Sequence, residues 1–110
     1  MEGQLSTEVS VRKNVAILTV VGDARGERST DLLHAMLAAI DGPYGPSVVV
    51  DVAGVTSFDD GALDILGMGG RAAQLLGGTL HVASPSPAVM DAILQRLSRP
   101  RTGRRSFKPR

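Results

Sequence analysis

Three consecutive valines near the middle of the chain restrict the fold more than any other feature of the sequence. They lie in the run SVVVDVAG, residues 47–54, which ends at Gly54. β-branched side chains disfavour a helix, and a short apolar run that stops at a glycine is typical of a strand. The run therefore predicts a buried strand, and the chain around it is expected to supply a sheet with helices packed against it.

Strand-like and helix-like segments alternate along the chain. Residues 4–12 alternate apolar and polar side chains, and residues 15–22 are apolar on both faces, so a hairpin with a tight turn opens the fold. The second of these strands is expected to be covered on both faces, by a second layer or by a partner. Helices are expected within residues 27–42, 60–76 and 84–97, and a fourth strand at 79–83. The order ββαβαβα predicts a single α/β domain with a mixed, mainly parallel sheet, an opening antiparallel hairpin and packed helices.

The helices have expected caps and expected apolar stripes. Ser29, Thr30 or Asp31 is the candidate N-cap of the first helix, and Ser86 caps the third, with Pro87 at its first position. The residues expected to face the core are Leu33, Met36, Leu37 and Ile40 in the first helix, Ala62, Ile65, Leu66, Gly69, Ala73 and Leu76 in the second, and Met90, Ile93, Leu94 and Leu97 in the third.

The charges are divided unevenly between the body of the chain and its end. All 11 acidic residues and 6 of the 12 basic residues precede Arg99, whereas residues 99–110 carry the other 6 basic residues and no acidic one. We therefore expect a domain at 1–98 and a basic, disordered tail at 99–110, which has too little apolar content to order itself. A tail of this kind can bind polyanions, so contact with nucleic acid or a membrane surface stays open.

Composition argues against several classes of protein. The chain has no cysteine, which excludes disulfides, thiolate metal sites and a cysteine nucleophile. Aromatic residues make up only 3% of it, so base stacking on single-stranded nucleic acid is disfavoured. No apolar run approaches the ~18 residues of a membrane span, and the amino terminus lacks a signal-peptide pattern. A soluble cytoplasmic protein is the expectation.

The stretch GVTSFDDGALDIL, residues 54–66, places Asp59 and Asp60 at the start of the second helix. An aspartate there accepts backbone N–H bonds, typically for about 1 kcal/mol, and this cap is the favoured interpretation. Catalysis would need a positioned base, acid or metal, and none can be assembled from the sequence. Mg²⁺ prefers oxygen ligands, but the spacing of Asp51, Asp59, Asp60 and Asp64 matches no recognised ligand loop. A receiver-type acidic pocket would also need carboxylates after the second strand, where Asp23 is the only candidate. We expect no enzyme activity, no metal and no cofactor.

Other motifs allow both a structural and a functional interpretation. The stretch GDARGERST, residues 22–30, precedes a helix as phosphate cradles do, but it lacks the Gly-Lys pair of a P-loop, so a turn is favoured. His34 and His81 have no nucleophile beside them, and structural roles are expected. Gly67, Gly69 and Gly70 each cost about 1 kcal/mol inside a helix. Close packing by Gly69 on the sheet, or an open strip for a ligand or partner backbone, would account for them.

Residues 47–94 resemble the STAS domain family, which includes anti-sigma factor antagonists and the cytoplasmic domains of sulphate transporters. The matching segments are VVVDVAGVTSFDDGAL, LLGGTLHVASPSPAV and the hairpin with Gly22 after its second strand. The resemblance covers about residues 5–97. It implies a non-catalytic binding module in which a phosphorylatable Ser or Thr at the helix start controls capture of an anti-sigma factor kinase.

The helix start departs from the D-S-S-G-L or D-S-T-G-L pattern of that family. Aligning Asp59 and Leu63 with its Asp and Leu places Asp60 on the first hydroxyl position and Gly61 on the phosphoacceptor. Arg25 also stands where a family turn has Asp, and the final strand and helix of many members are absent. The resemblance therefore implies a STAS protein that is not switched at Gly61, with Asp60 as a fixed charge. The expected partner-contact residues are Asp59, Asp60, Gly61, Ala62, Leu63, Asp64 and Gly67.

The partner that this resemblance implies is an anti-sigma factor or a related kinase-like regulatory protein in a bacterial sigma-factor network. Two other interpretations stay open. The chain could be the STAS component of a transporter or of a stressosome-like assembly, or a polyanion-binding accessory protein that acts through residues 99–110.

Overall fold

The computed structural model describes residues 4–98 and has the predicted order of elements, ββαβαβα. The basic tail, and with it the predicted disorder and polyanion contact of residues 99–110, lies outside the described residues. The strands are β1 (Leu5–Arg12), β2 (Val15–Asp23), β3 (Val48–Ser57) and β4 (Leu80–Ala83), and the helices are α1 (Arg28–Ile40), α2 (Asp60–Leu75) and α3 (Pro87–Ser98).

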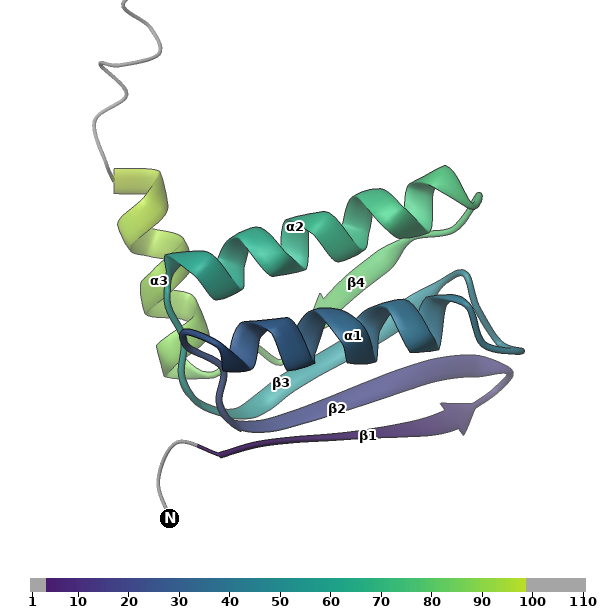
Figure 1. Cartoon of the computed structure of the whole chain (residues 1–110), viewed down its shortest axis with the longest axis horizontal. Helices are drawn as coiled ribbons and strands as arrows, with labels where there is room; N and C mark the ends of the chain where they lie inside the picture. The colour runs from purple at the N-terminus through teal and green to yellow at the C-terminus, as the bar shows by residue number, and fades with distance from the viewer. Residues whose placement is uncertain (1–3, 99–110) are drawn as a thin grey trace, which may run out of the picture.

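The four strands form one mixed sheet in the order β1-β2-β3-β4 (Figure 1). β1 and β2 are antiparallel, and the turn between them is Lys13–Asn14, whose φ angles are 52° and 65°. Positive φ at both turn residues suits a two-residue hairpin because it matches the twist of the strands. β3 pairs in parallel with β2 and with β4. The predicted sheet is confirmed, and it brings the carboxyl ends of β2, β3 and β4 to one edge.

Helices α1 and α2 lie side by side over one face of the sheet (Figure 1). The core between these layers is aliphatic: Leu18, Val20, Val50 and Val52 of the strands are fully buried, as is Met36 of α1. Val49 and Asp51 are half-buried on the other face of β3. On that face of β2, Val15 and Val21 remain 37% and 47% exposed, so the expected cover on both sides of β2 is not found within residues 4–98.

Gly69 explains how closely α2 approaches the core. A Cβ at this position would lie 2.8 Å from Met36 Sδ and 3.2 Å from Leu80 Cδ1. A Cβ added at Gly67 or Gly70 would meet no atom within 4 Å, so these two glycines contribute nothing to this packing. The predicted close packing by Gly69 is confirmed, whereas the other two glycines face open space.

Two details of the helix predictions are wrong. The N-cap of α1 is Glu27, which makes no side-chain cap hydrogen bond. Ser29, Thr30 and Asp31 lie inside the helix, and the Ser29 hydroxyl instead donates to Gly26 O at 2.7 Å. In α1 the fully buried leucine is Leu32, while Leu37 is 39% exposed; in α2, Leu76 is the C-cap and is 61% exposed.

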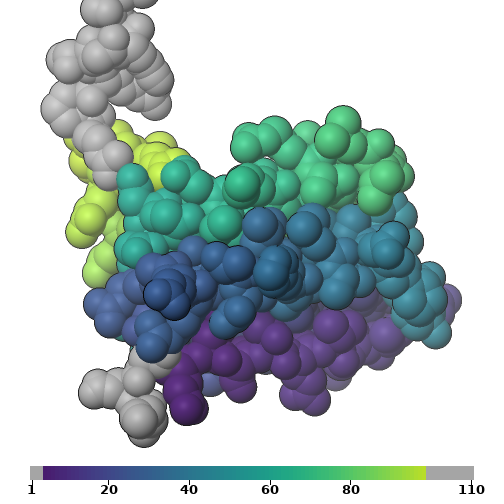
Figure 2. Space-filling model, viewed as in Figure 1, coloured from purple at the N-terminus to yellow at the C-terminus, as the bar shows by residue number. Residues whose placement is uncertain are grey.

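Most of the stripe predicted for α3 is also wrong, although Ile93 packs against the core as predicted and the cap is confirmed. Ser86 Oγ accepts from Val89 N at 3.3 Å, and Pro87 is the first helical residue. The helix buries Val89 and Ala92, but Met90, Leu94 and Leu97 are 43%, 53% and 65% exposed. The reason is its place in the fold: α3 stands at one end of the sheet, against β3 and the start of α2, instead of lying across the strands (Figures 1 and 2).

Candidate functional site

The start of α2 lies at the sheet edge where the parallel strands end, which is where open α/β sheets usually place ligands. Two loops meet there, one after β2 and one after β3. The backbone joins them, because Ala24 N donates to Ser57 O at 3.0 Å. The residues that follow Ser57 begin the stretch FDDGAL, so the predicted site residues lie beside Asp23, at the end of β2, and Arg25, in the loop after it.

Asp59 is the N-cap of α2, as predicted. Its backbone is extended, with φ −125°, and its Oδ1 accepts from Ala62 N at 2.9 Å. Its Oδ2 accepts from Gly26 N at 3.3 Å. Both carboxylate oxygens therefore bind backbone N–H groups, one from the helix and one from the loop after β2. This arrangement fixes the two loops relative to each other and supports a structural role for Asp59.

Asp60 and Asp64 are both held by an arginine of α3. The Arg96 guanidinium donates to Asp60 Oδ1 at 2.7 Å and to Asp64 Oδ1 at 2.9 Å. It also donates to the backbone oxygen of Asp60 at 3.2 Å. The side chains of Asp60 and Asp64 are 47% and 66% exposed, so this ion-pair cluster lies on the surface. Arg96 thus links the first turn of α2 to the last turn of α3.

The remaining predicted site residues differ in accessibility. Gly61 is exposed, and the nearest atom to a Cβ built there is Asp59 Oδ1 at 3.5 Å, an ordinary van der Waals distance. Gly67 is also exposed, one to two turns further along α2. Leu63 packs against the core, and Ala62 is fully buried, so a partner cannot contact Ala62 directly. The accessible surface is formed by Asp60, Gly61, Asp64 and Gly67.

Hydrogen bonds between Asp23 and Arg25 stabilise the loop after β2. Asp23 Oδ1 accepts from Arg25 N at 2.9 Å and from Arg25 Nε at 3.0 Å, and Oδ2 accepts from Arg25 Nη2 at 3.0 Å. These hydrogen bonds to Arg25 lower the pKa of Asp23 from 3.8 to about 2, against the opposing effect of burial. Asp23 is thus an ionised, almost fully buried cap of the loop and not a free acid.

The other candidate residues from the sequence lie on different elements or already bind backbone groups. Among residues 4–98, no three His, Asp or Glu side chains lie close enough together to hold a metal ion. Asp51 accepts from Ala53 N at 3.0 Å, and His34 and His81 are exposed on different elements. The backbone N–H of Gly26, in the stretch compared with a phosphate cradle, is used by Asp59. In the same part of the chain, no helix is long and apolar enough to cross a membrane.

Sequence reasoning missed Arg96 as a residue of the site. It lies in the last turn of α3, 36 and 32 positions from Asp60 and Asp64. The only available signal was that Arg96 is the single basic residue of α3. That signal does not identify a partner, because the contact depends on how α3 stands against α2.

Comparisons with known proteins identify the family. A family model described as "Mlab, STAS domain" matches residues 7–98. The chain belongs to the STAS domain family. A comparison with curated proteins finds no match.

Solved structures show the same fold. An anti-sigma factor antagonist from Mycobacterium paratuberculosis is similar with a TM-score of 0.73 and 22% identity, over 88% of this chain and 84% of that one. A STAS domain of an antisigma-factor antagonist from Rhodobacter sphaeroides gives 0.59 and 18%, over 77% and 95%. A structure described as Mglu gives 0.61 and 22% over 73% of this chain, which spans 20% of that longer protein. The chain is thus a STAS domain structurally similar to anti-sigma factor antagonists.

Proposed function

We propose that this STAS domain is a non-catalytic regulator that binds an anti-sigma factor or a related kinase-like protein, and that phosphorylation at the usual position does not switch the binding. The contact surface is the first two turns of α2, with Asp60, Gly61, Asp64 and Gly67 accessible. The structural likeness to anti-sigma factor antagonists supports the choice of partner.

The observation that carries this proposal is Gly61. It occupies the position aligned with the phosphoacceptor, it is exposed, and it has no hydroxyl group. A phosphate would add a charge of roughly −2 at the amino end of the helix. Gly61 cannot accept one, so this chain lacks the means to change the charge of its contact surface at that point.

Fixed charges take the place of a switchable one. Asp60 and Asp64 are negative at neutral pH, and Arg96 holds both in one orientation on the surface of α2. An ordered pair of carboxylates suits a partner with a cationic contact, because complementary charges speed association and fix the register of an interface. Binding under this proposal does not depend on phosphorylation of the chain.

Incubation with an anti-sigma factor kinase of the source cell and ATP tests the proposal. We expect no phosphate on the wild-type chain and stoichiometric phosphate on Gly61→Ser, whose Cβ would lie at an ordinary contact distance of 3.5 Å from Asp59 Oδ1. Gly67→Ser is the matched control, since it adds a hydroxyl at another exposed glycine of the same helix. Stoichiometric phosphate on Thr56 or Ser57 of the wild type, together with loss of binding, would sink the idea.

A further inference from the structure

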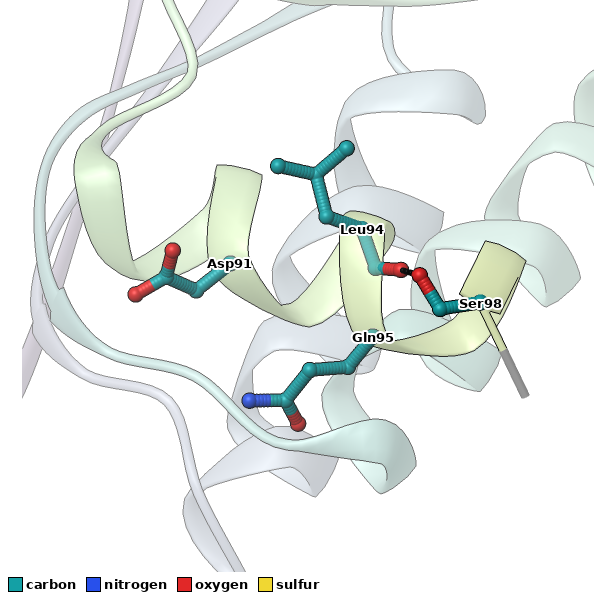
Figure 3. A pocket seen from close by; sticks show the side chains of 4 residues that line it. All are labelled: Asp91, Leu94, Gln95 and Ser98. Carbon is teal, nitrogen blue, oxygen red and sulfur yellow. Dashed lines mark hydrogen bonds between the residues drawn. The ribbon is translucent and has the colours of Figure 1, made fainter.

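A groove runs along the face of α3 that the core leaves uncovered. At one end it lies between the α3 residues Ala88, Asp91 and Gln95 and the loop residues Arg25 and Phe58, with a volume of about 270 Å³. A second, shallow hollow lies on α3 itself, where the described residues that line it are Asp91, Leu94, Gln95 and Ser98 (Figure 3). We call the two together the α3 groove. One water takes up about 30 Å³ of liquid, so the groove has room for side chains.

The α3 groove combines apolar surface with negative charge. Leu94 is 53% exposed there, and Phe58 is half-buried at the other end. Asp91 is exposed and makes no ion pair with any residue between 4 and 98. The Arg25 guanidinium at the groove's edge is already bound by Asp23. A segment with an apolar side chain for Leu94 and a cation for Asp91 therefore complements this surface.

The chain itself has such a segment next to the groove. Residues 99–110 start directly after Ser98, which lines the end of the groove, and they contain six basic residues, no acidic one and Phe107. Twelve residues can span up to about 40 Å. The α3 axis from Ser98 back to Ala88, at the far end of the groove, is only about 15 Å long at 1.5 Å per residue. The segment is therefore long enough to turn and return along the whole groove.

Residues 99–110 are joined covalently to α3, so even a weak attraction to the groove can hold them there. A site and a ligand joined by a short connection meet at an effective concentration of the order of millimolar. The body of the chain is acidic and the segment is basic, so the electrostatic attraction has the right sign. The acidic flank also argues against an anionic membrane as the occupant of this groove, because like charges would face each other.

We propose that the α3 groove is the docking surface for residues 99–110 of the same chain, with Phe107 against Leu94 and a basic side chain at Asp91. The groove ends at Ser57 and Phe58, immediately before the Asp59 cap of α2. A docked segment borders the partner surface and competes with a partner for it. Only this regulatory consequence rests on the proposed function; the docking itself does not.

A spin label on the full-length chain tests the docking. Because the chain has no cysteine, Arg110→Cys gives a single labelling site. We expect the label to broaden the amide NMR signals of Phe58 and Ala88, at the end of the groove farthest from Ser98, at least twofold more than exposed amides of α1. The excess broadening should disappear at 1 M salt, because the screening length is then only about 3 Å. It should also disappear in Asp91→Asn, which removes the carboxylate. Leu94→Ser should also reduce the broadening.

Asp31→Asn is the matched control, since it removes an exposed carboxylate of α1 that lines neither hollow of the groove. It should leave the broadening unchanged. The proposal is overturned if the broadening spreads evenly over the surface, if Asp91→Asn and Asp31→Asn have the same effect, or if the signal arises between labelled and unlabelled molecules in a mixture. The experiment contains no partner protein, so a negative result does not contradict the proposed partner binding. In the same way, a chain that does not bind the proposed partner could still show the docking.

Discussion

Glycines of α2 show how strongly the role of a residue depends on its position. Gly69 lies against Met36 and Leu80, where a larger residue must displace the core. Gly67, two positions earlier, faces open space, and Gly61 stands exposed at the helix start. The same residue type therefore serves packing at one position and leaves an accessible surface at the others.

Stability measurements on two alanine variants separate these roles. Gly67→Ala should raise the free energy of unfolding by about 1 kcal/mol, because alanine favours the helix and its Cβ meets nothing. Gly69→Ala gains the same propensity but must push Met36 and Leu80 aside, so it should be less stable than Gly67→Ala. Urea unfolding of both variants gives the comparison. Equal stabilisation at the two positions would show that the close approach of α2 to the core is wrong.

Asp23 makes acid stability a residue-scale test. Its pKa is about 2 in the folded protein and 3.8 without its partner, so it stabilises the fold fully above about pH 4. That contribution is lost as the pH falls from 3.8 towards 2. Asp23→Asn should therefore lower the thermal midpoint at pH 7, and the gap to the wild type should close below pH 4. A gap that is independent of pH would mean that the charge of Asp23 plays no part.

At the scale of elements, the sequence predicted correctly those features that depend on residues close together in the chain. The valine run, the Lys13–Asn14 turn and the caps Asp59 and Ser86 each depend on neighbours within about four residues, and the structure confirms them. The prediction of the buried face of α3 was mostly wrong, because periodicity shows which residues share a helix face and not which face the fold buries. Val89 and Ala92 are buried in the contact at the end of the sheet, whereas Leu94 and Leu97 are exposed.

Arg96 joins two elements, and its removal tests that connection. Arg96→Gln should loosen the end of α3, seen as faster hydrogen exchange of its last two turns, because the hydrogen bonds to Asp60 and Asp64 are lost. The difference from the wild type should shrink in high salt, since this cluster is exposed to solvent. Arg71→Gln is the control, an exposed arginine of α2 without an ion pair in the described part of the chain. Equal effects of both variants would contradict the role of Arg96.

At the scale of the whole molecule, the sheet edge brings distant residues into one surface. The resemblance to the STAS family predicted the candidate site, residues 59–64 with Gly67, and the same alignment showed that Gly61 lacks the hydroxyl. It could not predict that Arg96 of α3 orients Asp60 and Asp64, or that Gly26 after β2 binds Asp59. Those contacts cross 32 to 36 positions of sequence and arise only from the topology.

The central claim concerns binding that does not respond to phosphorylation. The direct measurement is the Kd of the chain for an anti-sigma factor kinase of its source cell, before and after incubation of the chain with that kinase and ATP, with the nucleotide removed before titration. We expect micromolar or tighter binding with the same Kd in both samples, and a Kd at least tenfold weaker only for incubated Gly61→Ser. A wild-type chain that loses its affinity after incubation with ATP would contradict the account.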